Sequence, residues 1–265
     1  MRSVTISLIS EFYKSRKTLA FWAAILLPVI ICSLISFGFY SNPEKVISIT
    51  PTGMLLWIRY AGATLNVMGF LVMPFYVIFM AFSVNNIEHK NDTWKTLFAQ
   101  PLNKFSIYTA KYLFAVLLIF ICLFLFAALT YGFGYLLQAL IPKYSFNQYN
   151  PVNFLVNSYT KLFLSSLGIL SIQFILSLIW GDFLKPIGIG FMGTIMGLVA
   201  GMLKWKYAYL IPYSLPSLAL QAAQVKKGND PLNFEIFGRD IYISFAYAVI
   251  LFVSGYFIVI RKSIK

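Results

Sequence analysis

The residues of this sequence that could do acid–base or metal chemistry are few and scattered. His89 is the only histidine, so the zinc-binding pattern H-E-x-x-H cannot be assembled. The carboxylates do not form the closely spaced clusters that hold a magnesium-bound diphosphate. They are Glu11, Glu44, Glu88, Asp92, Asp182, Asp230, Glu235 and Asp240. We therefore expect no catalytic residues, no metal site and no enzyme activity in this chain.

The sequence also lacks the motifs by which a protein uses ATP or a proton gradient as an energy source. The sequence has no G-x-x-x-x-G-K-[ST] loop, so we do not expect it to bind ATP or Mg²⁺ itself. A proton-coupled mechanism normally needs a carboxylate or histidine deep in a span, and we expect the spans to contain no charged side chain. Cys32 and Cys122 fall inside apolar stretches, where buried filler is the ordinary role. Any energy for work must come from a partner protein.

The elements that position these residues are long apolar runs. The chain is 60% hydrophobic and 11% charged, and a soluble fold could not bury so much apolar surface. The runs reach the ~20 residues that cross a bilayer as a helix, and they do not alternate as barrel strands do. We predict an all-α membrane protein, a single domain over residues 1–265 with six transmembrane helices. The expected spans are about 18–40, 61–84, 106–131, 159–181, 186–203 and 241–260.

Two features of these spans leave alternatives open. The apolar run that begins at Tyr112 either projects past the bilayer or ends in a turn near Gly132 and Gly134. In the fifth span, glycines at intervals of four allow close approach of another helix. That helix could belong to this chain or to a second copy.

Residues 1–17 have the pattern of an amphipathic helix at the membrane surface. At helical spacing the apolar half holds Val4, Leu8, Ile9, Phe12 and Tyr13, and the polar half holds Ser3, Ser7, Ser10, Glu11 and Lys14. We expect this interfacial helix to lie on the cytoplasmic leaflet and to lead into the first span. A solvated basic leader is the alternative.

Residues 85–104 are expected to form a cytoplasmic segment between the second and third spans that contains a short helix. Apolar residues fall at i, i+3 and i+4 on one face, and they are Trp94, Leu97 and Phe98. Asn91 or Asp92 can cap the start of this helix. The polar face, with Lys95 and the preceding Glu88, is expected to be available to a cytoplasmic protein.

Residues 204–240 are too long for a simple turn on the opposite side. The uncharged stretch Tyr207–Val225 is broken by Pro212 and Pro216. We expect short extracytoplasmic helices that dip into the outer interface, because a seventh span there would place the two termini on opposite sides of the membrane.

The net charge of +13 is distributed over the ends of the spans. Anionic lipids are therefore the expected partner of the Lys and Arg side chains, and nucleic acid is not. The termini and residues 85–111 carry most of these charges. By the positive-inside rule, both termini of this multi-pass protein are expected to be cytoplasmic.

Two stretches carry a family pattern. One is the leader Glu11-Phe-Tyr-Lys-Ser-Arg-Lys17, and the other is Glu88 followed by Thr93-Trp94-Lys95-Thr96-Leu97 with Pro101 and Lys111 beyond it. With the six-span topology, they resemble the permease subunits of type-2 ATP-binding-cassette (ABC) transporters. The resemblance points in particular to the small bacterial group of lantibiotic-immunity and bacitracin-resistance permeases.

The resemblance implies a permease of the bacterial cytoplasmic (inner) membrane that pairs with a second copy or a paralogue. A separate ABC ATPase subunit, which binds the ATP and Mg²⁺, would drive it through the helix between spans two and three. The residues that this assigns to coupling are Glu88, Asp92, Thr93, Trp94, Lys95, Leu97 and Phe98. The implied activity is export of an amphipathic or lipid-like compound such as an antimicrobial peptide, and no substrate-binding residue is assigned. A non-transporting scaffold or assembly subunit of the membrane is the alternative.

Overall fold

The computed structural model describes residues 2–50, 52–91, 93–99, 103–225 and 236–261. Within these ranges all regular structure is helical, and six helices are long and apolar enough to cross a membrane, which confirms the predicted fold class. In chain order the elements are α1 (Arg2–Ser15), α2 (Leu19–Ser41), α3 (Pro43–Ile49), α4 (Gly53–Val67), η1 (Met68–Val72), α5 (Met73–Lys90), α6 (Trp94–Ala99), α7 (Lys104–Leu140), η2 (Phe146–Gln148), α8 (Val152–Ile179), α9 (Leu184–Met202), η3 (Ala208–Leu210), η4 (Pro212–Ser214), α10 (Leu215–Val225) and α11 (Arg239–Arg261).

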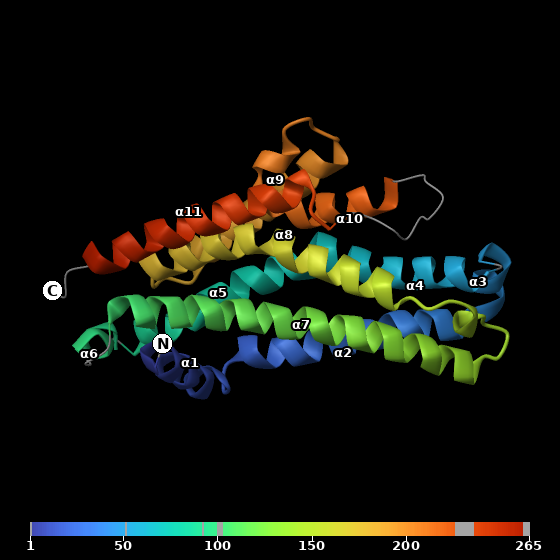
Figure 1. Cartoon of the computed structure of the whole chain (residues 1–265), viewed down its shortest axis with the longest axis horizontal. Coiled ribbons are helices and arrows are strands. Elements are labelled where there is room, and N and C mark those ends of the chain that lie inside the picture. The colour runs from blue at the N-terminus through green and yellow to red at the C-terminus, as the bar shows by residue number, and fades with distance from the viewer. Residues whose placement is uncertain (1, 51, 92, 100–102, 226–235, 262–265) are drawn as a thin grey trace.

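The spanning helices run side by side along the long axis of the molecule (Figure 1). Helix α7 is the longest single helix at 37 residues. At 1.5 Å per residue it extends roughly 55 Å, well beyond a hydrocarbon core of about 30 Å. It continues through Gly132 and Gly134 without a turn. Of the two alternatives for this run, the structure therefore has the helix that projects past the bilayer. Where the sequence suggested 106–131, the helix is longer at both ends.

The second span is one continuous run, Gly53–Lys90, with a wider turn near its centre. The turn is the π-helical segment η1, in which the N–H of Met73 bonds to the carbonyl of Met68, five residues earlier. The cause is Pro74, because it lacks an N–H and cannot close the ordinary helical hydrogen bond to Phe70. The run begins before the predicted 61–84, and Trp57 lies in the added turns, buried with its indole donating to the carbonyl of Phe146 at 2.8 Å.

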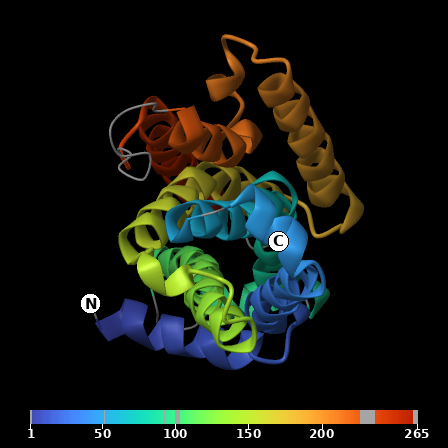
Figure 2. The same ribbon diagram turned by 90° about the vertical axis from the view of Figure 1, so that its right-hand side faces the viewer.

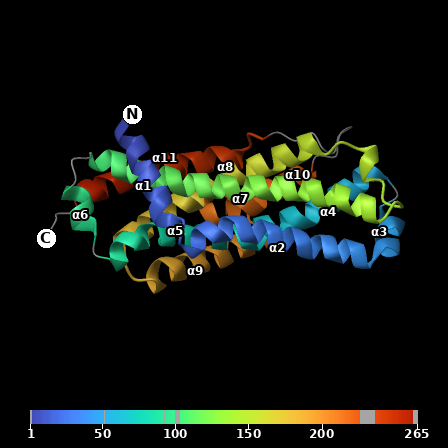
Figure 3. The same cartoon turned by 90° about the horizontal axis from the view of Figure 1, so that it is seen from below.

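Helix α1, helix α6 and the last turns of α11 lie at one end of the bundle, and α3 lies at the other (Figures 1 and 3). An even number of spans brings the two ends of the chain to the same side. The connection between the second and third spans, which carries α6, therefore shares a side with the first helix of the chain.

The partner of the α9 glycines lies in the segment that follows α9 in this same chain. Gly193 and Gly197 lie against Tyr213 and Ser214 of η4, so close that a Cβ on either glycine would meet these residues. The close approach that small residues allow is therefore between α9 and η4 of this same chain. Helix α9 nevertheless stands apart from the main bundle in end view (Figure 2). Tyr213 also accepts a hydrogen bond of 2.5 Å from Nε2 of Gln173 on α8. Residues 226–235 of the predicted extracytoplasmic segment lie outside the described residues.

The expectation that the spans hold no charged groups is wrong in two places. Lys111 lies in the second turn of α7, and Lys161 lies in the third turn of α8, and both side chains are buried. Nζ of Lys161 is 3.9 Å from Oδ2 of Asp240 at the start of α11. Charged groups inside a bundle are tolerated when they face the interior and are paired, so a charge does not mark the end of a helix here.

Candidate functional site

Helix α6 begins directly after the second span. The N–H of Thr93 bonds to the carbonyl of Glu88 at 3.0 Å, and the N–H of Leu97 bonds to the carbonyl of Thr93 at 2.9 Å. Asn91 or Asp92 was expected to cap α6, and the side-chain amide of Asn91 donates to the carbonyl of Ile87 at 2.9 Å, at the end of α5. Asp92, the other predicted cap, lies outside the described residues.

Four charged side chains meet where α1, α5 and α7 converge, and we call them the charge cluster: Glu11, Lys14, Glu88 and Lys111. Nζ of Lys111 donates to Oε2 of Glu88 at 2.5 Å, to Oε2 of Glu11 at 2.9 Å and to the carbonyl of Val84 at 3.3 Å. Nζ of Lys14 bridges the other oxygens of the same carboxylates, at 3.3 Å from Glu11 and 3.2 Å from Glu88. The two positive and two negative charges alternate around a closed ring.

Three members of the charge cluster are withdrawn from solvent. Glu11, Glu88 and Lys111 are only 2%, 1% and 1% exposed. Charges at such depth are stable only when paired and hydrogen-bonded, and removing one partner typically costs ~3–5 kcal/mol. The cluster therefore fixes the position of α1 and of the end of α5 relative to α7.

Lys14 lies at the open side of the cluster, with its side chain 31% exposed. Partial burial by itself lowers the pKa of this lysine, but the carboxylates of Glu11 and Glu88 outweigh that effect and hold the pKa above its ordinary value. Lys14 is consequently charged throughout the physiological pH range, so the ring holds two positive and two negative charges.

Helix α1 packs on α7 with its polar half. Ser7, Glu11 and Ser15 are buried, whereas Ile9 and Phe12 are exposed on the opposite half. A solvated leader does not fit this arrangement. The polar half turns toward the protein because Lys111 offers it a buried charge, and the apolar half is left for contact with lipid.

Trp94 attaches α6 to the same place. Its indole N–H donates to Nδ1 of His89 at 3.2 Å, and Nζ of Lys111 lies 5.8 Å from the centre of its ring. A small cavity of about 90 Å³ separates Leu97 from Glu11 and Ile107, on α1 and α7. Helix α6 is thus held against the spans by Trp94 and faces α1 through Leu97.

The structure brings some of the predicted coupling residues together and separates others. Glu88 belongs to the charge cluster, the Trp94 ring lies beside Lys111 of that cluster, and Thr93 and Leu97 are half-buried. Glu88 was expected to be available to a cytoplasmic protein, and this is wrong, because Lys111 and Lys14 enclose its carboxylate. Asp92 and the side chains of Lys95 and Phe98 lie outside what the structure describes.

Glu11, Lys14, His89 and Lys111 were not predicted as site residues. Glu11 and Lys111 belong to the stretches that carried the family resemblance, which was the available signal for them. For His89 the signal was that it is the single histidine and lies next to a predicted site residue.

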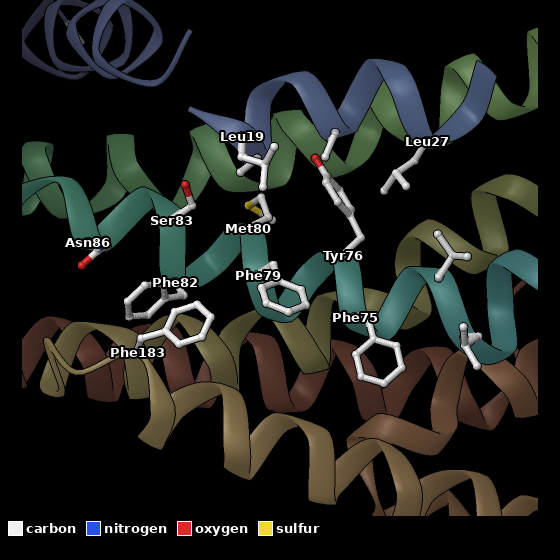
Figure 4. Close-up of a pocket in the computed structure, with 14 residues that line it drawn as sticks. Leu19, Leu27, Phe75, Tyr76, Phe79, Met80, Phe82, Ser83, Asn86 and Phe183 are labelled. Carbon is white, nitrogen blue, oxygen red and sulfur yellow. The ribbon is translucent and has the colours of Figure 1, made fainter. Parts of the chain in front are cut away.

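A second feature is an apolar groove between α2 and the second span (Figure 4). Its volume is about 520 Å³, within the range of about 300–1,000 Å³ typical of small-molecule sites. Leu19 and Leu27 of α2 point toward Tyr76 and Met80 of α5 across it. The aromatic lining is completed by Phe75, Phe79, Phe82 and Phe183.

Apart from the hydroxyl of Tyr76, which donates to the carbonyl of Leu118, the polar groups of the groove lie at one end. Ser83 and Asn86, one and two turns beyond Phe79 on α5, line the end nearest the charge cluster. Lys17, two residues before Leu19, is exposed beyond the same end. A ligand that fits this lining has a long apolar part and a polar head toward the side of α6.

These features define a multi-pass membrane protein in which a surface helix is tied to the spans by buried charge. Among the described residues, no three His, Cys, Asp or Glu side chains gather as a metal ion would require. Residues 7–197 match the family described as ABC-2 family transporter protein, and the chain belongs to this family. It is accordingly a membrane subunit that is not itself catalytic, and permeases of this family generally pair with an ABC ATPase subunit.

The matched region includes the whole charge cluster and the groove, and it stops before α10 and α11. No curated protein and no solved structure matches the chain.

Proposed function

We propose that this chain is a permease subunit that a separate ABC ATPase drives from the cytoplasm to expel an amphipathic or lipid-like compound, such as an antimicrobial peptide. It works in a bacterial cytoplasmic membrane, with both termini inside and a second copy or a paralogue beside it. The lantibiotic-immunity and bacitracin-resistance permeases are the group that it resembles.

The observation that carries this proposal is the attachment of α6. Helix α6 meets α5 through Trp94 and His89, and Lys111 links the same place to α1 and α7. A push on α6 is therefore passed through Trp94 to the second and third spans, and the buried ion pairs of the charge cluster pass it on to α1, which leads into the first span. A helix that only connected two spans would need no such attachment.

The mechanism is a rigid-body one. Closure of two ATPase subunits on ATP displaces α6 in each permease, and the spans that the charge cluster joins move with it. The cavity between the two permeases then opens alternately to the two sides. Because the cluster is neutral overall and closed, it can move as a unit without exposing a buried charge.

The groove supports the substrate part of the proposal. Its lining is aromatic and aliphatic over most of its length, with Ser83 and Asn86 at one end. That distribution suits a compound with an acyl chain or an apolar peptide face attached to a polar head. Small hydrophilic solutes would find almost no hydrogen-bonding groups there.

Purification in mild detergent tests the proposed function. We expect a soluble ABC ATPase in equal amount with the permease, and ATP hydrolysis that rises when the two are combined in lipid. Recovery of other membrane subunits without an ATPase would instead favour the scaffold function. Trp94→Ala should keep the protein in the membrane but abolish the stimulated hydrolysis, because α6 loses its attachment to the spans.

A further inference from the structure

His89 connects three elements at the root of α6. It lies in the last turn of α5, where Nδ1 accepts the indole N–H of Trp94 at 3.2 Å and Nε2 is 3.1 Å from the carbonyl oxygen of Ser177 on α8. The rings of His89 and Trp94 lie edge to face, with their centres 5.4 Å apart. Gly181 borders the imidazole so closely that a Cβ there would be 3.1 Å from Nδ1.

Both hydrogen bonds can form together in only one protonation state. The indole N–H of Trp94 is solely a donor, and the Ser177 carbonyl is solely an acceptor. The imidazole must then carry its proton on Nε2 and leave Nδ1 free to accept. A doubly protonated imidazolium has a proton on each nitrogen, so its Nδ1–H would point at the N–H of Trp94.

The charged groups around His89 oppose a further positive charge. Lys111 lies over the same Trp94 ring from α7, and Lys90 follows His89 on its own helix. Glu88 is already paired with Lys111 and Lys14. Asp182, next to Gly181, is exposed and accepts the N–H of Leu184. Protonation of His89 therefore places its Nδ1–H opposite the indole N–H of Trp94, beside the ammonium group of Lys111.

We propose that His89 is a proton-sensitive positioning residue for α6: its neutral imidazole holds Trp94 against the spans, and its protonation releases Trp94 and uncouples the permease from its ATPase. The inference rests on the proposed function for its consequence, but the contact itself belongs to the permease alone. It assigns a regulatory input, the acidity of the cytoplasm, to the same site that receives the ATPase.

The first test uses the purified permease without any partner. The ¹⁵N-indole resonance of Trp94, identified by its loss in Trp94→Phe, should move between about pH 7.5 and about pH 5.5, where imidazoles titrate. In His89→Asn the side-chain oxygen can still accept the indole N–H but does not titrate, so the resonance should stay in place. A Trp94 resonance that is unaffected by pH, or that moves equally in His89→Asn, overturns the proposal.

The second test uses the permease in lipid with the ABC ATPase that copurifies with it, and compares hydrolysis with that of the ATPase alone at each pH. Stimulation by the native chain should fall about threefold to tenfold between about pH 7.5 and about pH 5.5. His89→Asn, whose side chain does not titrate, should show no acid-induced fall in stimulation. His89→Gln, which reaches the Ser177 carbonyl but leaves Nδ1 without a counterpart, should stimulate weakly at every pH.

An equal fall in stimulation in the native chain and in His89→Asn contradicts the proposal. Absence of stimulation at any pH in the native chain would defeat the proposed function instead, and the indole resonance would still decide whether His89 holds Trp94. The two failures are therefore distinguishable.

Discussion

The ammonium group of Lys111 donates a hydrogen bond of 2.9 Å to the carboxylate of Glu11, a residue 100 positions earlier in the chain. This contact binds the surface helix α1 to the third span, in addition to its covalent link to the first. Glu88 approaches the same ammonium from the second span at 2.5 Å. Helix α1 and the end of α5, which leads into α6, therefore bind the same buried ammonium group.

Replacing Lys111 is expected to destabilise the protein strongly. Lys111→Met leaves two buried carboxylates with only Lys14 between them, and losing one partner of such a cluster costs ~3–5 kcal/mol. Unfolding in detergent, followed by circular dichroism, measures the change. Lys143→Met, at an exposed loop position, is the control and should stay within about 0.5 kcal/mol of the native protein.

A second substitution should recover part of that loss. In Lys111→Met with Glu88→Gln, the remaining Glu11 and Lys14 carry equal and opposite charges, so one uncompensated charge disappears. The pair should therefore cost less than the sum of the two single variants, as expected for residues in direct contact. Strict additivity would show that the charge cluster does not act as a unit.

Loss of the attachment of α6 should uncouple the ATPase without unfolding the spans. We expect Trp94→Ala and charge reversal at Lys95 to abolish stimulated ATP hydrolysis while membrane insertion remains normal. Charge reversal at Glu88 should also abolish it, together with a loss of stability, because the Glu88 carboxylate belongs to the buried charge cluster. Trp205→Ala is the control, because Trp205 is exposed in the segment after α9. Unchanged stimulation in all three variants would count against α6 as the coupling element.

Filling the groove should block transport and leave coupling intact. Ala23 lines the groove, so the indole of Ala23→Trp would occupy the space of an apolar ligand. Leu26→Trp adds the same bulk at an exposed position of α2 that does not line it. Resistance of cells to an amphipathic antimicrobial peptide is the readout, and equal resistance in both variants would argue for a binding site elsewhere.

The pH dependence of stability should report the raised pKa of Lys14. A lysine whose pKa is higher in the folded than in the unfolded protein stabilises the fold fully below its ordinary value of 10.5, and this contribution is lost as the pH rises through the folded value. The difference in unfolding free energy between the native protein and Lys14→Met should thus be constant near neutral pH and shrink in strong alkali. A difference that grows with alkalinity would contradict the bridging role of Lys14.

The spans could be predicted from the sequence because an uncharged run long enough to cross the bilayer has few other stable structures. Their ends could not, because the helix of the second span begins at Gly53 and α7 continues to Leu140, so both project beyond the length that crosses the bilayer. Likewise, the glycines of α9 predicted close packing but not its partner, η4.

The site was predictable in outline only. The short helix around Trp94 follows from apolar spacing and the family pattern. That Glu88 is buried, and that Glu11 shares Lys111 with it, depends on α1 packing along α7, which local sequence does not specify. The groove depends on the distance between α2 and α5, and no single residue signals it.

Labelling of one introduced cysteine tests most directly whether work enters through α6 from the cytoplasm. Cys32 and Cys122 are buried, so Thr96→Cys, at an exposed position of α6, should be the reactive thiol for a membrane-impermeant maleimide. We predict that it reacts in inside-out vesicles, is protected there by bound ATPase, and stays unlabelled in right-side-out vesicles, whereas Lys143→Cys shows the opposite sidedness. Labelling of Thr96→Cys in right-side-out vesicles would contradict the account.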